Sequence, residues 1–103
     1  MNNGEFTEKD WKLFRNKIAG WQENYMDRLN KEYIDLLSGN AKPSDKFWRL
    51  EKRIRKDQNK TGVQVHMSRS ALISNIVSLI NEGAISIEDL DEFSEMCIRD
   101  RFS

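Results

Sequence analysis

The chain has 103 residues, 17 basic and 17 acidic side chains, three Trp, two Tyr and five Phe, which allow one globular domain with a modest core and exclude a disordered tail. A single Cys excludes a disulfide scaffold or a multi-cysteine metal site. No apolar run approaches the roughly 18 residues that span a bilayer, and the first residues do not form a signal peptide, so we expect a soluble, cytoplasmic protein.

The segment Thr7–Leu37 carries a helical pattern. Its apolar residues are spaced by three or four and therefore share one face: Trp11, Phe14, Ile18, Trp21, Tyr25, Leu29, Tyr33 and Leu36. Thr7 and Asp10 have the spacing of a capping box, and Gly39 is expected to end the helix in the left-handed conformation. A single helix would be about 45 Å long. A bend at Gly20 would divide it into two collinear pieces.

A second helix is predicted from Ser44 to about Asn59. Ser44 is expected to cap it, with Pro43 just outside, and the Lys60–Gly62 segment should end it. Its apolar residues are Phe47, Leu50 and Ile54, with Trp48 beside them. In the segment that follows, Val63, Val65 and Met67 alternate with polar residues, which predicts an extended connector that packs Val and Met inward.

A third helix is predicted from Ser68, as its cap, to about Asn81, and Gly83 should close it. This is the most apolar element, and its core side consists of Leu72, Ile73, Ile76, Val77, Leu79 and Ile80. Ser86 and Asp89 form another capping box, which predicts a fourth helix. The expected fold class is all-α, a small bundle of about four helices with a long first helix and a truncated last one.

Basic residues form a stripe on the second helix, where Lys46, Arg49, Arg53 and Lys56 follow helical spacing. Residues 42–60 contain eight basic and three acidic side chains. The stripe could contact the phosphates of a nucleic acid, with Trp48 as a stacking group. It could also be a solvated face, or neutralise the acidic segment 82–95. The whole chain is neutral, unlike most nucleic-acid-binding domains, which favours a structural role.

Aromatic side chains on the first helix are the second candidate surface. They are Trp11, Phe14, Trp21, Tyr25 and Tyr33. Such a stripe is usually core, but we expect the other helices to leave part of it uncovered, and exposed Trp and Tyr are typical of interfaces. This pattern predicts a protein partner, with a homodimer through the first helix as the simplest form.

Catalytic, metal-binding and cofactor-binding motifs are absent from the sequence. His66 is the only imidazole, it lies on the polar side of the connector, and no nucleophile or carboxylate is placed with it by a known motif. We therefore expect a non-enzymatic protein without a cofactor, acting as a protein–protein interaction or regulatory module. The alternatives are an accessory, sequence-nonspecific nucleic-acid binder through residues 44–60, and a small-molecule site near His66.

Several stretches resemble a family of small bacterial helical proteins: Gly20–Ile34, Lys42–Ile54, Met67–Ser70 and Leu90–Ser94. The likeness covers nearly everything from Trp11 to Glu95. Members of that family often carry the automatic name "multidrug transporter". The resemblance implies a helical fold and no catalytic or binding residues. The transporter name conflicts with a sequence that has no membrane-spanning segment.

The residues Met96–Arg101 read Met-Cys-Ile-Arg-Asp-Arg, which looks like the translation of a transposon-end oligonucleotide used as a sequencing adaptor. The acidic pattern of the preceding segment also stops at Glu95. We therefore expect one helical domain over residues 1–95 and a non-native tail over residues 96–103.

Overall fold

The computed structural model describes residues 7–93, and every regular element in that range is helical. In chain order the elements are α1 (Glu8–Ser38), α2 (Pro43–Asp57), the 3₁₀ turn η1 (Arg69–Ala71), α3 (Leu72–Asn81) and the 3₁₀ turn η2 (Ile87–Leu90). The all-α fold class is confirmed. The predicted tail, Met96–Ser103, lies outside the described residues.

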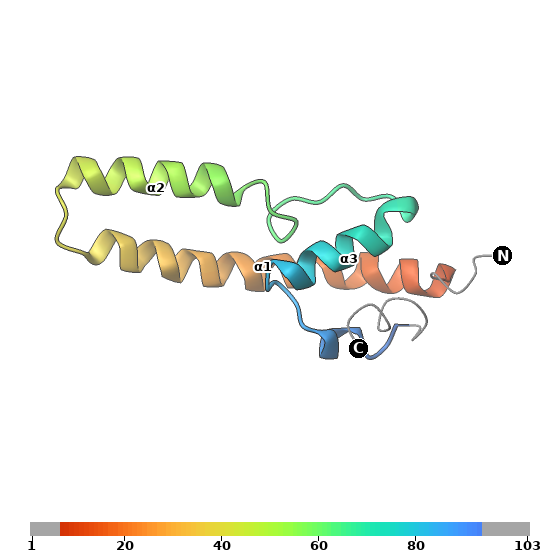
Figure 1. Cartoon of the computed structure of the whole chain (residues 1–103). Helices are drawn as coiled ribbons and strands as arrows, with labels where there is room; N and C mark the ends of the chain where they lie inside the picture. Colours follow the sequence, from red (N-terminus) through yellow and green to blue (C-terminus); the bar gives the residue numbers. More distant parts are fainter. Residues whose placement is uncertain (1–6, 94–103) are drawn as a thin grey trace.

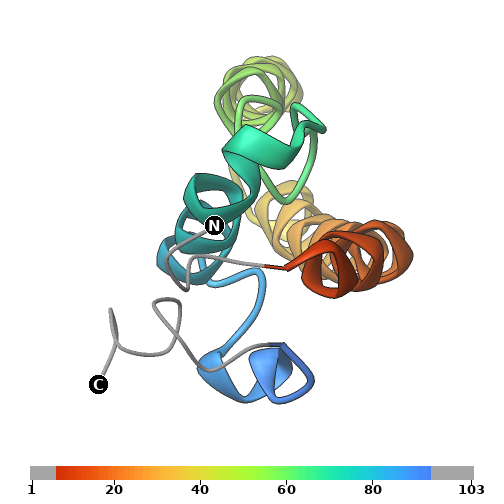
Figure 2. The same cartoon turned by 90° about the vertical axis from the view of Figure 1, so that its right-hand side faces the viewer.

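Helix α1 is the spine of an elongated molecule with extents of 58 × 23 × 20 Å. Helix α2 runs back along the C-terminal half of α1, while α3 and η2 lie against its N-terminal half (Figures 1 and 2). We call α2 together with the C-terminal half of α1 the hairpin half. We call α3 and η2 together with the N-terminal half of α1 the core half. The two halves therefore lie at opposite ends of one helix.

The predicted capping box starts α1. The backbone N–H of Asp10 donates to Thr7 Oγ1, and the backbone N–H of Thr7 donates to an Asp10 carboxylate oxygen, both at 3.1 Å. The helix passes through Gly20 without a break. The left-handed conformation predicted for Gly39 is wrong, because its φ of −72° and ψ of −175° are extended. The chain therefore continues from α1 in an extended conformation into the connection to α2.

The limits of α2 differ from the prediction at both ends. Pro43 is its first residue, Lys42 takes the N-cap position without a side-chain hydrogen bond, and the predicted cap Ser44 lies inside the helix. Proline suits a first helical position because its φ is already helical and the N–H that it lacks would have no intrahelical partner. The helix ends at Asp57, two residues before the predicted Asn59.

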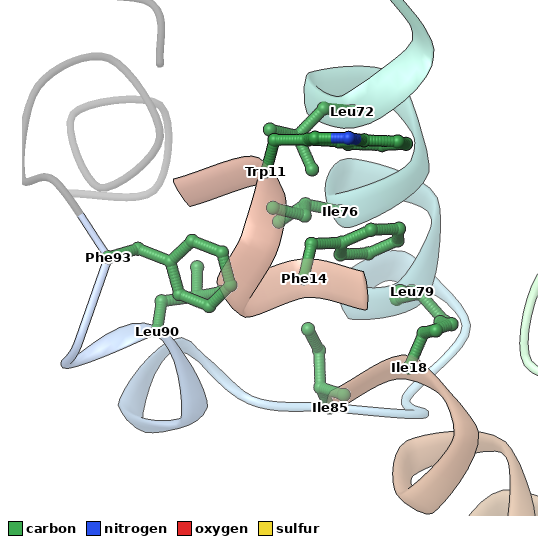
Figure 3. Close-up of a cluster of buried hydrophobic side chains, with 9 residues drawn as sticks. All are labelled: Trp11, Phe14, Ile18, Leu72, Ile76, Leu79, Ile85, Leu90 and Phe93. Carbon is green, nitrogen blue, oxygen red and sulfur yellow. The ribbon is translucent and has the colours of Figure 1, made fainter. Parts of the chain in front are cut away.

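The hydrophobic core lies between α1, α3 and η2 (Figure 3). It consists of Trp11, Phe14, Ile18, Leu72, Ile76, Leu79, Ile85, Leu90 and Phe93. Ile76 is fully buried at its centre, as predicted. Val65 of the connector packs against this core, but Met67 is 40% exposed, so the expectation that it packs inward is wrong.

Backbone hydrogen bonds explain how both ends of the α3 segment are fixed. Ser68 caps η1 by accepting from the backbone N–H of Ala71 at 3.2 Å, and the chain then continues as α3. Gly83 has a φ of 79°, and the N–H of Ala84 donates to the carbonyl of Leu79 at 2.9 Å. These are features of the Schellman motif, in which a left-handed glycine follows the helix.

The predicted fourth helix is replaced, in the described residues, by the four-residue turn η2. Ser86 and Asp89 do form the predicted capping box, but the chain continues as a 3₁₀ turn. Leu90 is the last residue of this turn and is buried in the core. The backbone N–H of Phe93 donates to the Leu90 carbonyl at 2.9 Å, and Phe93 is buried in the core as well.

A tight turn after α2, at residues 60–63, connects the two halves. The Glu82 carboxylate accepts from the backbone N–H groups of Thr61 and Gly62 at 3.0 and 3.1 Å, and Gln22 Nε2 donates to the Thr61 carbonyl at 3.2 Å. Gly62 is buried against the ring of Tyr25. We call this arrangement the Glu82 clasp; it holds the end of α2 to α1 and to the end of α3.

Candidate interaction surface on the helical hairpin

Large apolar side chains are exposed on the hairpin half. The exposed fractions are 63% for Phe47, 63% for Trp48 and 42% for Ile54 on α2, and 61% for Ile34 and 41% for Leu37 on α1. We call these five residues, together with the half-buried Leu50, the hairpin surface. Neither α3 nor η2 reaches this end of α1 (Figure 1). The apolar side of α2 is therefore left uncovered.

Polar contacts attach α2 to α1. Asp57 is the only buried residue of α2, and its carboxylate accepts from the Tyr33 hydroxyl at 2.7 Å and from Arg53 Nε at 2.9 Å. Arg53 also pairs with Glu32 of α1. These contacts leave Phe47, Trp48 and Ile54 exposed.

The hairpin surface is hollowed in two places. A cavity of about 340 Å³ runs along α2, and another of about 260 Å³ lies between α2 and α1. Ile54 and Gln58 line both, so the two hollows adjoin. The second is floored by Met26 and Leu29 of α1 and includes Tyr33 and Asp57. The first hollow is lined from α2 and its C-cap alone, and the second forms a groove between the two helices.

The pKa of Tyr33 is strongly raised in this groove. Its burial, followed by the hydrogen bond to the Asp57 carboxylate, raises the pKa of Tyr33 from its ordinary value of 10 to about 12. Burial, followed by the charge of Glu82, also raises the pKa of Tyr25. The fold thus favours the neutral form of both phenols.

Alkaline pH is therefore expected to destabilise the fold. In the unfolded chain Tyr33 loses its proton near pH 10, whereas in the folded chain it keeps the proton until about pH 12. The contribution of Tyr33 to stability is complete below pH 10 and is lost as the pH rises from 10 to 12. Ultraviolet absorbance titration of the wild type and of Tyr33→Phe measures this. Ionisation of both tyrosines near pH 10 while the helical circular dichroism persists would contradict the assignment.

The four predicted phosphate-contacting residues have different environments. Arg49 and Lys56 are exposed, Lys46 is half-buried, and none of the three has an ion-pair partner within residues 7–93. Arg53 is engaged by Glu32 and Asp57 and lies over the Tyr33 ring at 5.6 Å. Arg53 therefore serves the fold, which corrects its place in the phosphate-contacting stripe.

The acidic segment does not neutralise α2 in the described residues. Glu92 instead pairs with Lys17 of α1 at 3.1 Å, in the core half. Helix α2 lies at the other end of the molecule (Figure 1). The prediction that the acidic segment neutralises the basic stripe of α2 is therefore wrong for the described residues.

The predicted aromatic interface is largely part of the protein's own core. Trp11, Phe14 and Tyr25 are buried, and Trp21 and Tyr33 are half-buried. Trp11, Phe14 and Trp21 pack in or against the core. The ring of Tyr25 contacts the turn at Gly62, and α2 covers Tyr33. The prediction of an interface along this stripe is corrected, because intramolecular packing already occupies it.

His66 is exposed, as its position in the connector predicts. Its backbone carbonyl accepts from Asn75 Nδ2 at 2.9 Å. Within residues 7–93, no three His, Cys, Asp or Glu side chains are grouped to hold a metal ion. None of the helices in the same range has the length and hydropathy needed to cross a membrane.

Comparison of the chain with protein-family models, curated proteins and solved structures gives no match. The family resemblance stated above remains a prediction, as does the adaptor origin of the last residues.

Proposed function

We propose that this protein is a non-enzymatic protein–protein interaction module that binds its partner through the hairpin surface. The observation that carries the proposal is the exposure of five large apolar side chains on two neighbouring helices, beside a groove. A cytoplasmic location, expected from the sequence, is part of the proposal. The proposed interface thus moves from the aromatic stripe to the other end of α1.

The size of the hairpin surface supports this role. With a fully exposed aromatic side chain taken as about 150–250 Å², the five residues expose roughly 500 Å² of apolar area. The largest apolar patch on a typical monomer is about 300–600 Å² and is often functional. Phe47 and Trp48 are in edge contact, with ring centroids 5.0 Å apart. Exposed aromatic pairs of this kind are typical centres of protein interfaces.

A nucleic-acid binder is the alternative function. Arg49 and Lys56, which have no ion-pair partner within residues 7–93, and the exposed ring of Trp48 favour it, because such groups contact phosphates and stack on bases. The engagement of Arg53 by carboxylates weakens it. The proposal of a protein partner accounts for Phe47, Ile54 and the α1 residues as well, which phosphate contact does not.

Photocrosslinking at position 48 separates these functions. With Trp48 replaced by p-benzoyl-phenylalanine and the chain irradiated in living cells, we expect covalent adducts that a nuclease leaves intact. The same photoreactive group in place of Met67, an exposed apolar residue outside the hairpin surface, is the control and should give few adducts. Adducts degraded by a nuclease would favour the alternative. Equal yields at both positions, or no adducts, would overturn the proposal.

A further inference from the structure

We propose that the groove between α1 and α2 binds a small organic amine, an ammonium group on an apolar body, with the Asp57 carboxylate as its counter-ion. The inference goes beyond the proposed function, because it concerns a small-molecule ligand and not the protein partner. The groove adjoins the hairpin surface and shares Ile54 with it.

The groove has the make-up of a small-molecule site. Its volume is about 260 Å³, slightly below the roughly 300–1,000 Å³ of sites for drug-sized ligands, so its occupant is small. Ligand sites are mostly apolar, with a few polar groups that orient the ligand. The apolar part of this wall consists of Met26, Leu29, Ile54 and Val63. The occupant therefore has an apolar body.

The wall contains one charged side chain among the described residues, the carboxylate of Asp57. Asp57 is 3% exposed, and both of its side-chain hydrogen bonds, from the Tyr33 hydroxyl and from Arg53 Nε, end on the same oxygen, Oδ2. Within residues 7–93 every fully enclosed polar side-chain atom has a partner, so Oδ1, which accepts no hydrogen bond there, is not fully enclosed. The open space that Asp57 lines is the groove. Oδ1 can therefore accept from a donor in the groove.

The ion pairs around Asp57 leave one negative charge without a matching cation. Arg53 pairs with both Asp57 and Glu32, so one guanidinium serves two carboxylates. No Lys or Arg of the described residues lines the groove to supply a second positive charge. A carboxylate away from water gains most from a donor that is itself charged. An ammonium group supplies the charge and the donor together, whereas an anionic ligand would be repelled.

A metal ion does not fit the same groove. Hard cations take about six oxygen ligands, and most of this wall is apolar. In the part of the chain that the structure describes, no three His, Cys, Asp or Glu side chains are grouped to hold a metal. The chemistry of the wall thus selects an organic cation.

Nuclear magnetic resonance titration of the full chain tests the site with three compounds that share a phenyl ring and a short chain. Phenethylamine is a cation, 2-phenylethanol is neutral and phenylacetate is an anion. Phenethylamine has about nine non-hydrogen atoms, and we expect it to shift the methyl signals of Met26 and Ile54 saturably, with a dissociation constant of about 1 mM or less. The alcohol should bind at least about tenfold more weakly, because the charge-assisted hydrogen bond is lost. Phenylacetate should not bind, and the methyl signals of Ile76 in the core should not move.

A substitution in the wall tests the location. Asn30 lines the groove and is exposed, so Asn30→Lys places a competing ammonium group there without disturbing the core. It should weaken phenethylamine binding at least about tenfold. Asn24→Lys adds the same charge at an exposed position of α1 outside the groove and should leave the affinity unchanged. Equal losses in both variants would overturn the inference.

The remaining outcomes also decide the question. Equal affinity for the three compounds would show apolar adhesion alone and overturn the inference, as would the lack of saturable shifts at about 10 mM, ten times the expected upper limit. N-acetyl-lysine amide should bind at least about tenfold more weakly than phenethylamine, because its unbranched chain buries less apolar area. Equal binding would assign the groove to a lysine of a protein partner and overturn the inference as stated. None of these results alters the crosslinking at position 48, so the two proposals fail separately.

Discussion

The substitution Ile76→Ala is expected to lower the free energy of unfolding by about 2–5 kcal/mol. Ile76 is fully buried, and it lies between Trp11 and Phe14 of α1 and the neighbouring residues of α3 (Figure 3). Removing three carbon atoms there leaves a cavity lined by α1 and α3, and the two helices cannot both shift to fill it. Chemical denaturation followed by circular dichroism measures the change.

Met67→Ala is the control for this experiment. Met67 is 40% exposed and lies outside the core, so its truncation should change the stability by less than about 0.5 kcal/mol. A loss below about 1 kcal/mol for Ile76→Ala would show that the centre of the core is elsewhere.

The substitution Gly62→Ala is expected to destabilise the fold by about 1–3 kcal/mol. A Cβ at this position would lie 2.3 Å from Tyr25 Cδ2 and 2.8 Å from two further ring atoms. The ring cannot move away easily, because it is 6% exposed and the guanidinium of Arg28 lies over it at 5.4 Å. The backbone at Gly62 must therefore shift, which strains the Glu82 clasp. Thermal and chemical unfolding measure the effect.

Gly20→Ala provides the matched comparison. Gly20 lies inside α1 with no atom within 4 Å of the added Cβ, so the same substitution should stabilise the chain by about 0.5–1 kcal/mol. In a Tyr25→Leu background, the cost of Gly62→Ala should shrink, because the clashing ring is gone. An equal cost in both backgrounds would place the effect of Gly62→Ala outside the contact with Tyr25.

Local features of the fold could be predicted from the sequence where the signal and the contact are only a few residues apart. Both capping boxes, at Thr7 and at Ser86, occur as predicted, since each joins a side chain to a backbone group three residues away. The two glycines after helices had different outcomes. Gly83 is left-handed and completes a Schellman motif, whereas Gly39 is extended and leads into Pro43. Pro43, predicted to lie just outside the next helix, is its first residue.

The candidate site could not be predicted, because it depends on which helix covers which part of α1. The apolar residues of α2 follow ordinary helical spacing, and their pattern alone cannot show that α3 packs at the other end of α1. Arg53 follows the same spacing as Arg49, but its partner Glu32 lies 21 residues earlier in the chain. No short pattern reveals such a pair. Ile34 and Leu37 lie outside the aromatic stripe of α1. They are the sign in the sequence of a second apolar face on this helix.

The position of α1 between the two halves also affects how the molecule unfolds. Within residues 7–93, α1 is the one helix that both halves share. The Glu82 clasp, the hydrogen bonds from Arg28 to the carbonyls of Gly83 and Ala84, and the chain connection after α2 also link the halves. The hairpin half contributes little buried apolar area, so α2 can detach while the core half persists. The amide protons of α2 would then exchange with solvent earlier than those of α3. A partner bound at the hairpin would slow that exchange selectively, and the effect would fade along α1 toward Trp11.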